Sequence, residues 1–262
     1  MKHRLFLLLA VATFALASCE KEMEVYPRCF SVSETKQVFF SPGNLQYMVA
    51  LNKYQFAPTQ LDVIGNSNNQ ISPTYSGSID LFGWGTGSNP TMSVEDGNMY
   101  PSFDDWGKHL EEAGWRTLTH EEWNYLLQKR PNANKLYGTC TVQDANFGNH
   151  RGLVILPDKW NCDTIEVSYT GEYNQHLYDI DHWRLMEKAG AIFLPAAGNR
   201  MGKSVKGVGE YGRYWSSSPT PMGCAFFMGF LRSDVDDGTL RSNGRSVRLV
   251  KDITSPSQIP AN

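Results

Sequence analysis

The clearest period-two pattern in the chain lies between residues 225 and 230. Large apolar side chains occupy every second position from Phe226 to Phe230, which predicts a strand whose two faces meet different surroundings. The Asp237-Gly238 pair that follows is typical of a tight turn, because both residue types tolerate a positive φ. We therefore expect a hairpin in which the chain returns as a second strand over residues 246–250.

Two segments carry the sequence signals of helices. Thr119 and Glu122 have the spacing of a capping box, in which each side chain accepts a hydrogen bond from the other residue's backbone N–H. The helix predicted to start there ends shortly before Pro131, since proline cannot continue a helix. A second helix is predicted over residues 179–189, with Gly190 at the position of a C-terminal cap.

Short apolar runs bounded by turn residues predict further strands. They are residues 38–47 with a turn at 41–44, residues 54–57, residues 153–156 and residues 191–194. Two polar stretches, residues 65–77 and 200–212, lack any periodicity and are predicted to be loops. Residues 79–85 gather large apolar side chains among glycines, and we interpret them as a turn inside the core.

The first 18 residues have the pattern of a signal peptide, with a positive start, an apolar run and small residues at the end. The apolar run is too short for a membrane-spanning helix. Residues 16–19, Leu-Ala-Ser-Cys, resemble the lipobox of bacterial lipoproteins, which implies that Cys19 becomes the acylated first residue of the mature chain. A cleaved secretory signal followed by an ordinary cysteine is the alternative.

Removal of residues 1–18 would leave 244 residues and change the formal charge from −3 to −5, because Lys2 and Arg4 are lost. Residues 19–28 would form a lipidated tether, residues 29–252 one domain, and residues 253–262 a flexible tail. The acidic cluster after Cys19 resembles the signal that sends Bacteroidetes lipoproteins to the outer face of the cell. We therefore expect a protein lipid-anchored in the outer membrane and exposed at the cell surface.

Composition and charge narrow the class of protein. A hydrophobic content of 41% with 12% aromatic residues is enough for a sizeable core. The mild acidity argues against nucleic acid as a partner, since a concentrated basic face would then be expected. No linker rich in proline, serine or glycine divides the chain, which favours a single domain.

Four cysteines remain besides Cys19, at positions 29, 140, 162 and 224. Disulfides are permitted in an exported protein, and four cysteines allow three pairings that the sequence does not separate. The pairing of Cys140 with Cys162 is favoured, because the polar stretch between them would gain most from closure. Four free buried cysteines, Cys29, Cys140, Cys162 and Cys224, are the alternative.

The ends of the C-terminal region carry a resemblance to a known family. Tyr-Trp-Ser-Ser-Ser at 214–218 and Gly-Arg-Ser-Val-Arg-Leu-Val at 244–250 resemble motifs of Bacteroidales lipoproteins whose domain is related to the C-type lectin fold. That fold is also used by the formylglycine-generating enzyme, by the Fibrobacter major paralogous domain and by the variable proteins of diversity-generating retroelements. The other matching segments, in order, are residues 30–33, 38–47, 79–85, 115–127 and 192–198.

The resemblance covers about residues 29–250 and implies an α+β, C-type lectin-like fold with short antiparallel strands, two main helices and long ordered loops. It also implies a surface lipoprotein that binds an extracellular protein or glycan through its C-terminal hairpin region. The candidate ligand-binding residues are Thr220, Met222, Phe227, Arg232, Asp234, Asp236, Arg241 and Asn243. Residues 224–230 lack the Tyr, Asn, Ser and Asp typical of diversified relatives, which favours a fixed paralogue.

Enzymatic function is not expected. The formylglycine generator holds copper with two nearby cysteines in its C-terminal half, whereas Cys224 is the one cysteine in residues 209–250 here. The serines at 216–218 lack a nucleophile elbow, and His120 and Glu121 are interpreted as a solvated first helical turn. A structural or pilus-associated surface component is a second functional alternative.

No cofactor is expected, although calcium remains an alternative at two clusters of acids. Residues 234–238 offer alternate carboxylates, but a hairpin turn with solvated Asp residues is the commoner arrangement. The Asp104-Asp105 pair is interpreted in the same way, as the cap of a short helix. The cysteines and histidines show no metal-ligand spacing.

Overall fold

The computed structural model describes residues 28–72, 74–92, 102–160, 167–221, 224–231 and 238–254. Within them the fold is mixed α+β, with mostly short strands and few helices. The strands form four sheets of three to five strands. No helix in this part of the chain is long and apolar enough to cross a membrane.

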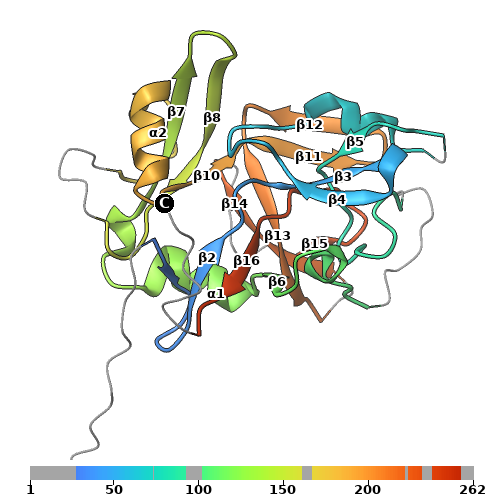
Figure 1. Cartoon of the computed structure of the whole chain (residues 1–262), viewed down its shortest axis with the longest axis horizontal. Coiled ribbons are helices and arrows are strands. Elements are labelled where there is room, and N and C mark those ends of the chain that lie inside the picture. The colour runs from blue at the N-terminus through green and yellow to red at the C-terminus, as the bar shows by residue number, and fades with distance from the viewer. Residues whose placement is uncertain are drawn as a thin grey trace, which may run out of the picture.

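The first sheet joins the two ends of the described chain. Its order is β1 (Phe30–Ser31), β2 (Gln37–Phe40), β16 (Leu249–Asp252) and β6 (Trp115–Thr117). β16 is antiparallel to both of its neighbours and lies between them at the centre of the molecule (Figure 1). The last strand of the chain is therefore held by two segments from its first half.

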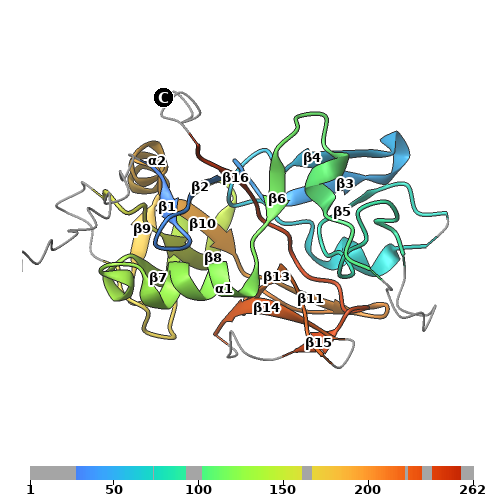
Figure 2. The ribbon, with the colours of Figure 1, turned by 90° about the horizontal axis from the view of Figure 1, so that it is seen from below.

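The largest sheet has five strands and comes from the C-terminal third of the chain. Its order is β12 (Ser204–Val208), β11 (Ala197–Met201), β13 (Gly212–Pro219), β14 (Cys224–Phe230) and β15 (Thr239–Leu240). All neighbours are antiparallel except β11 and β13. In Figure 2 the strands β14 and β15 run along the lower edge of the molecule.

Two further sheets flank the centre. One has the order β10 (Ile192–Pro195), β8 (Gly148–Ile155), β7 (Tyr137–Asp144) and β9 (Leu177–Asp179). The other has the order β4 (Lys53–Phe56), β3 (Leu45–Met48) and β5 (Ser78–Ile79). The first projects with helix α2 at the upper left of Figure 1, and the second lies at the upper right.

Both predicted helices are present. Helix α1 (His120–Asn124) starts with the predicted capping box: Glu122 N donates to Thr119 Oγ1 at 3.1 Å, and Thr119 N donates to Glu122 Oε2 at 2.9 Å. It continues as a π-helical turn, η5 (Tyr125–Lys129). Helix α2 (Ile180–Lys188) is capped by Asp179, and Gly190 follows it with a φ of 101°.

Four short 3₁₀ turns complete the described elements: η1 (Val49–Leu51), η2 (Gly65–Gln70), η4 (Trp106–His109) and η6 (Ala133–Lys135). The turn η2 corrects part of the loop predicted over residues 65–77. Its Asn68 side chain donates to Gly65 O at 2.8 Å and to Asp80 Oδ1 at 2.7 Å. Buried side-chain hydrogen bonds thus order a segment that has no apolar period.

The predicted hairpin is wrong in its second half. β14 is followed by the short strand β15, which pairs with it through Cys224–Leu240 and Ala225–Thr239, while β16 lies in another sheet. Leu249 and Val250 are both fully buried and belong to different core clusters, so this strand is covered on both faces while β2 and β6 pair with its two edges.

The loop predicted over residues 200–212 is also wrong. It contains most of the antiparallel β11–β12 hairpin, with Gly202 in its turn at a φ of 61°. Gly207, at a φ of 73°, and the exposed Lys206 in β12 leave no alternating apolar pattern that could have revealed this strand.

The core is built on buried indole rings around the β13–β14 pair. Tyr214, Met228 and Phe230 pack with Trp123 and the α1–η5 segment in one cluster. On the opposite face, the cluster contains Trp215, Ala225, Phe227, Trp84 and Trp106. The prediction that the strand over residues 225–230 has two different surroundings is confirmed.

The favoured disulfide is not formed. Cys140 carries a free thiol that is fully buried in β7 among apolar side chains, where it acts as a small hydrophobic residue. Its proposed partner, Cys162, lies outside the described residues. Burial raises the pKa of the Cys29 thiol to about 12 and raises that of Cys140 as well, so both thiols stay protonated at neutral pH.

Candidate binding surface

Two segments meet at the open end of the β13–β14–β15 strands, and we call them the C-terminal surface: residues 219–221 and 238–241. Thr220 N donates to Cys224 O at 3.0 Å, which closes the first segment onto β14. Leu240 lies opposite Cys224 in the strand register, which places the second segment on the other side of β14. Both segments therefore extend from one sheet.

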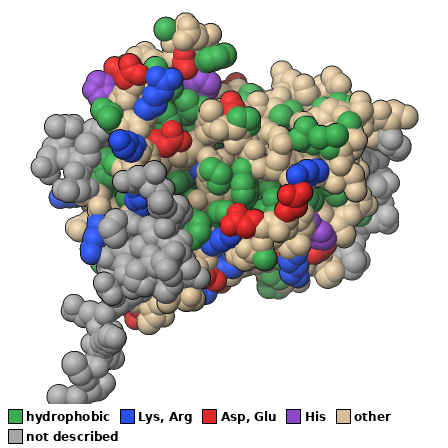
Figure 3. Space-filling model, viewed as in Figure 1, with side chains coloured by type: hydrophobic (Ala, Val, Ile, Leu, Met, Phe, Trp, Pro, Cys, Tyr) green, Lys and Arg blue, Asp and Glu red, His purple; other side chains and the backbone are tan. Residues whose placement is uncertain are grey.

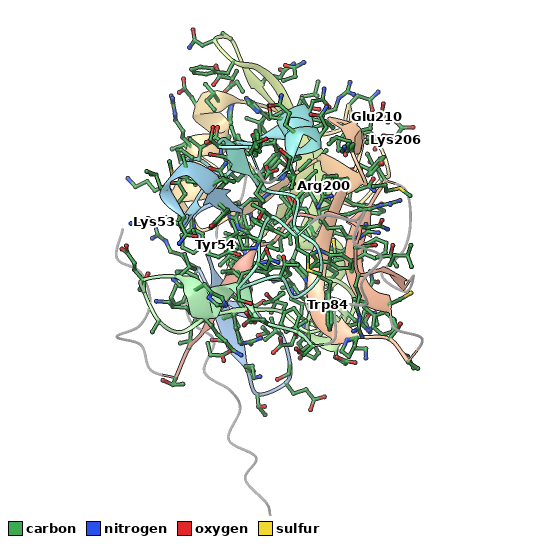
Figure 4. The ribbon with its side chains drawn as sticks, turned by 90° about the vertical axis from the view of Figure 1, so that its right-hand side faces the viewer. Lys53, Tyr54, Trp84, Arg200, Lys206 and Glu210 are labelled. Carbon is green, nitrogen blue, oxygen red and sulfur yellow. The ribbon has the colours of Figure 1, made fainter. Side chains whose placement is uncertain are left out.

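The C-terminal surface rests on a tightly bonded support. Trp84 is buried, its indole Nε1 donates to Ser216 O at 2.8 Å, and its backbone N donates to Arg241 O at 2.7 Å. Trp215 Nε1 donates to Phe82 O at 2.7 Å. The two indoles thus connect the sheet to residues 82–84, and Figure 4 shows Trp84 against the ribbon of that sheet.

The serines at 216–218 hold the irregular part of β13 through their hydroxyl groups. Ser216 Oγ donates to Phe226 O at 2.8 Å, where the register of β13 and β14 shifts. Ser217 Oγ donates to Leu118 O, and Ser218 Oγ accepts from His120 N at 3.0 Å. These hydroxyls form hydrogen bonds with backbone groups that the interrupted strand pairing would otherwise leave without a partner.

Arg241 is a predicted site residue that reaches the C-terminal surface. Its guanidinium carbon lies 4.3 Å from the centre of the Trp84 ring, and its Nε donates to Cys224 O at 3.1 Å. The side chain is half-buried, so it is fixed in place while part of it faces solvent. A cation held over an indole face is stabilised by the negative potential of the ring.

Thr220 also lies on the C-terminal surface and shows how close its two segments approach. A Cβ added to Gly238 would lie 2.8 Å from Thr220 Cγ2, so only glycine fits there without a shift. The Thr220 Oγ1 atom is buried and has no hydrogen-bond partner. Both features show tight packing at this point rather than a loose loop.

Two predicted site residues lie inside the protein instead. Phe227 is 4% exposed and packs in the core between β13 and Arg245, so its ring is not available to an external ligand. Asn243 is buried and donates from Nδ2 to Thr239 Oγ1 at 2.8 Å, which holds the turn after β15. Strand alternation shows that two faces differ, but it does not show which one is covered.

The other predicted positions fall outside the described residues. They are Cys19, Met222, Arg232, Asp234 and Asp236. The Asp104-Asp105 pair is described, and the predicted cap is confirmed, since Asp105 is the N-cap of η4 and accepts from Gly107 N at 3.1 Å. Asp104 accepts from His109 at 2.9 Å. Across the described part of the chain, no group of three or more His, Cys, Asp or Glu side chains could hold a metal ion.

Sequence reasoning missed two features close to the C-terminal surface. Leu240 is 62% exposed and adds apolar area to this surface. His120 is half-buried, and its ring is stacked on Phe226 at 4.3 Å with 19° between the planes, so the first turn of α1 is not simply solvated. The only sequence signal for the stacking of His120 was strand alternation, which places Phe226 on the opposite face from Phe227.

Cavities occur elsewhere on the described surface. The most apolar one has a volume of about 600 Å³ and lies between α2 and the β7–β8 hairpin, with Trp183 in its wall and the 81%-exposed Phe147 at its edge. A more polar one of about 650 Å³ lies beside Trp160 and His176. Neither includes a residue of the C-terminal surface.

Comparisons of the chain with models of protein families, with curated proteins and with solved structures find no match. The class of protein is therefore defined by the structure alone. It is a strand-rich α+β domain with a candidate binding surface at the end of its largest sheet.

Proposed function

We propose that this protein is a lipid-anchored, outward-facing lipoprotein with a C-type lectin-like domain, which binds an extracellular protein or glycan through the C-terminal surface. The lipobox at residues 16–19 supports the anchor, with Cys19 as the acylated residue. The ordered motifs from residue 30 to residue 250 support the family. The role is binding rather than catalysis, with no cofactor and no nucleic acid.

One observation carries the proposed binding role: side chains suited to recognition are exposed on a rigid support. Leu240 and Arg241 offer an apolar group and a cation next to each other, and Trp84 beneath them is tied to β13 by its indole hydrogen bond. Binding sites are commonly short loops on a fixed scaffold. Little ordering entropy would be lost when such a surface binds.

The distribution of charge agrees with a protein or glycan partner. On the face drawn in Figure 3, acidic and basic side chains are interspersed, and no broad basic area is visible. A nucleic-acid partner would favour a continuous basic stripe. Arg241 instead offers a single fixed cation beside apolar area, which suits the centre of a protein or carbohydrate contact.

Binding is tested with the full-length protein, purified in a non-ionic detergent and applied to arrays of glycans and of host and bacterial surface proteins. We expect a saturable ligand whose binding is weakened about tenfold or more by Leu240→Asp or Arg241→Ala, as for central contact residues. Leu51→Asp is the matched control, because Leu51 is 63% exposed in η1. Equal effects of Leu240→Asp and Leu51→Asp, or no ligand at all, would contradict the proposal and favour a structural component.

Location is tested separately on intact cells. Externally added protease should remove the domain from cells that produce the full-length protein, while a periplasmic marker stays intact. Complete protection of the protein would exclude the outward-facing orientation. Cys19→Ala should release the protein from the membrane fraction if the lipid anchor is correct.

A further inference from the structure

Arg245 is a buried cation whose donors are not satisfied by the protein. It is 1% exposed, and its guanidinium carbon lies 3.7 Å from the centre of the Phe227 ring and 5.1 Å from that of Trp215. Its Nε and Nη1 atoms are buried and have no hydrogen-bond partner. Unpaired polar atoms of a buried charge are costly, so their presence in a folded core needs an explanation.

No carboxylate of the described residues lies within ion-pair distance of Arg245. The nearest charge that affects it is a second cation, Arg213. Burial first and then Arg213 lower the pKa of Arg245 well below its usual value, and the opposing effect of Tyr211 is smaller. Two arginines therefore share a region in which the described residues supply no ion-pairing carboxylate.

Arg213 occupies the same face of the sheet as the rings around Arg245. It lies two residues before Trp215 on β13, so the two side chains point to one side. Opposite Arg213 on β14 is Gly229, which has no side chain to fill the space beside it. The Arg213 guanidinium carbon lies 4.9 Å from the Tyr211 ring, and its buried Nε also has no partner.

The neighbouring strand adds another unmatched donor. Asn199 follows Gly198, the β11 residue that pairs with Gly212, and it shares with Arg213 a contact to the Tyr211 side chain. Its Oδ1 accepts from Tyr211 OH at 2.6 Å, while its Nδ2 is buried without a partner. Lys206 lies opposite Asn199 on β12 and is exposed. In Figure 4 it lies at the upper right, whereas Trp84 is near the bottom of the domain. Asn199, Lys206 and Arg213 therefore bring hydrogen-bond donors and positive charge to this part of the sheet.

We propose that Arg213 and Arg245, with Asn199 beside them, form a binding site for an oxyanion, either a carboxylate or a sulfate or phosphate group carried by a ligand. Arginine guanidinium groups bind such groups through paired, charge-assisted N–H···O bonds. Arg245 forms the inner wall, and the half-buried Arg213 forms the side that solvent reaches. The site shares no residue with the C-terminal surface, so it stands or falls independently of the proposed function.

The test measures thermal unfolding of the full-length detergent-purified protein at constant ionic strength, as chloride is replaced by sulfate or, in a second series, by acetate. A specific site gives a saturable rise in Tm with at least one of the two anions, because a ligand that binds only the folded state stabilises it. The stronger anion distinguishes a tetrahedral from a planar oxyanion. General salting-out by sulfate raises Tm without saturation.

Three variants separate specific binding from that general effect. Arg213 is half-buried, so the variant Arg213→Met should fold. We expect this variant to need an anion concentration about tenfold higher or more for half-saturation, because a charge-assisted hydrogen bond is lost. Arg245→Met should abolish saturation. Arg151→Met is the control, because Arg151 also lies over a tyrosine, 5.7 Å from the Tyr173 ring. A wild-type response that does not saturate, or that Arg213→Met leaves equal to the control, would overturn the proposal.

Discussion

Buried arginines in the two halves of the chain differ in the partners that surround their guanidinium groups. In the first half, Arg130 Nη1 donates to Asp158 Oδ1 at 2.9 Å, and its Nη2 donates to Leu136 O. Asp158 also accepts from the backbone N and the Oγ of Ser31. Arg245, on the β13–β14 face, is equally buried, but it lies against the rings of Phe227 and Trp215 and has no ion pair with a described carboxylate.

Arg248 shows that a carboxylate is not needed to satisfy a buried arginine. It donates to Gln60 Oε1 at 2.5 Å, to Phe193 O at 3.4 Å and to Asn44 Oδ1 at 3.5 Å. Burial lowers its pKa to about 10, so it stays charged at neutral pH. Arg130, Arg248 and Arg245 all have a buried Nε without a partner, but both terminal nitrogens of Arg130 and Arg248 donate hydrogen bonds, whereas Nη1 of Arg245 does not. This difference separates the two structural arginines from the proposed site. The predictions below test this distinction.

The largest effect is expected for Asp158→Asn. It leaves the Arg130 charge buried without its carboxylate and should lower the free energy of unfolding by about 3–5 kcal/mol. Denaturant unfolding measures the loss. The double variant Asp158→Asn with Arg130→Met should recover part of it, because the unpaired charge is then removed; an unchanged loss would show that Arg130 is not the reason.

Gln60→Ala should have the next largest effect. Its Oε1 accepts from both Arg248 Nη2 and Phe193 N, so truncation leaves two buried donors unsatisfied. We expect a loss of about 2–4 kcal/mol in unfolding free energy, taking about 1–2 kcal/mol for each of the two orphaned donors. Gln55→Ala is the control, because Gln55 donates only to Gln46 on a half-exposed strand. Similar losses in both variants would contradict the account of Arg248.

Glu122→Gln tests a hydrogen-bonded carboxylate through its pH dependence. Burial alone would raise the pKa of Glu122, but hydrogen bonds from Arg116 and from Thr119 N lower it overall. The ionised form therefore stabilises the fold above the unfolded pKa of about 4.3, and that stability is lost as pH falls through the lower, folded pKa.

The wild type should therefore exceed Glu122→Gln in unfolding free energy by about 1–2 kcal/mol at pH 7, the size of a lost charged hydrogen bond. The gap should close as the pH is lowered below about 4. Urea unfolding at a series of pH values measures it. A gap that is independent of pH would mean that the charge of Glu122 contributes nothing.

The smallest effect is expected for Arg245→Met in buffer without oxyanions. Loss of the contacts with Phe227 and Trp215 is offset by removal of a buried, uncompensated charge. The free energy of unfolding should change by less than about 1 kcal/mol. Arg130→Met in the same buffer should lower the free energy of unfolding more, since it leaves Asp158 without its cation. A larger loss for Arg245→Met than for Arg130→Met would contradict the difference inferred between the two arginines.

The sequence correctly predicted those elements that are stabilised by contacts between residues a few positions apart. The Thr119 capping box and the Asp105 cap depend on residues two or three positions apart. The position of β16 between β2 and β6 depends instead on pairings more than 100 residues away, which no short pattern encodes. The class of short strands with two helices was therefore predictable, and the strand order was not.

The same limit applies to the candidate sites. Arg241 and Thr220 were predicted and lie on the C-terminal surface, whereas Phe227 was predicted and lies in the core. Arg245 was visible only as part of the motif at residues 244–250. Whether an arginine faces an acid is decided by distant contacts, as the 28 residues between Arg130 and Asp158 show.

The most direct test of the comparison follows the arginine Nε–Hε resonances of the isotope-labelled full-length protein by NMR during a sulfate titration at constant ionic strength, with an acetate series beside it. The account predicts saturable shifts for Arg213 and Arg245 with at least one anion, and none for Arg116 and Arg130, whose guanidinium groups are bonded to carboxylates. If Arg213 and Arg245 stay unmoved in both series, or if all four shift alike, the claim that the chain leaves an oxyanion site on the β13–β14 face is contradicted.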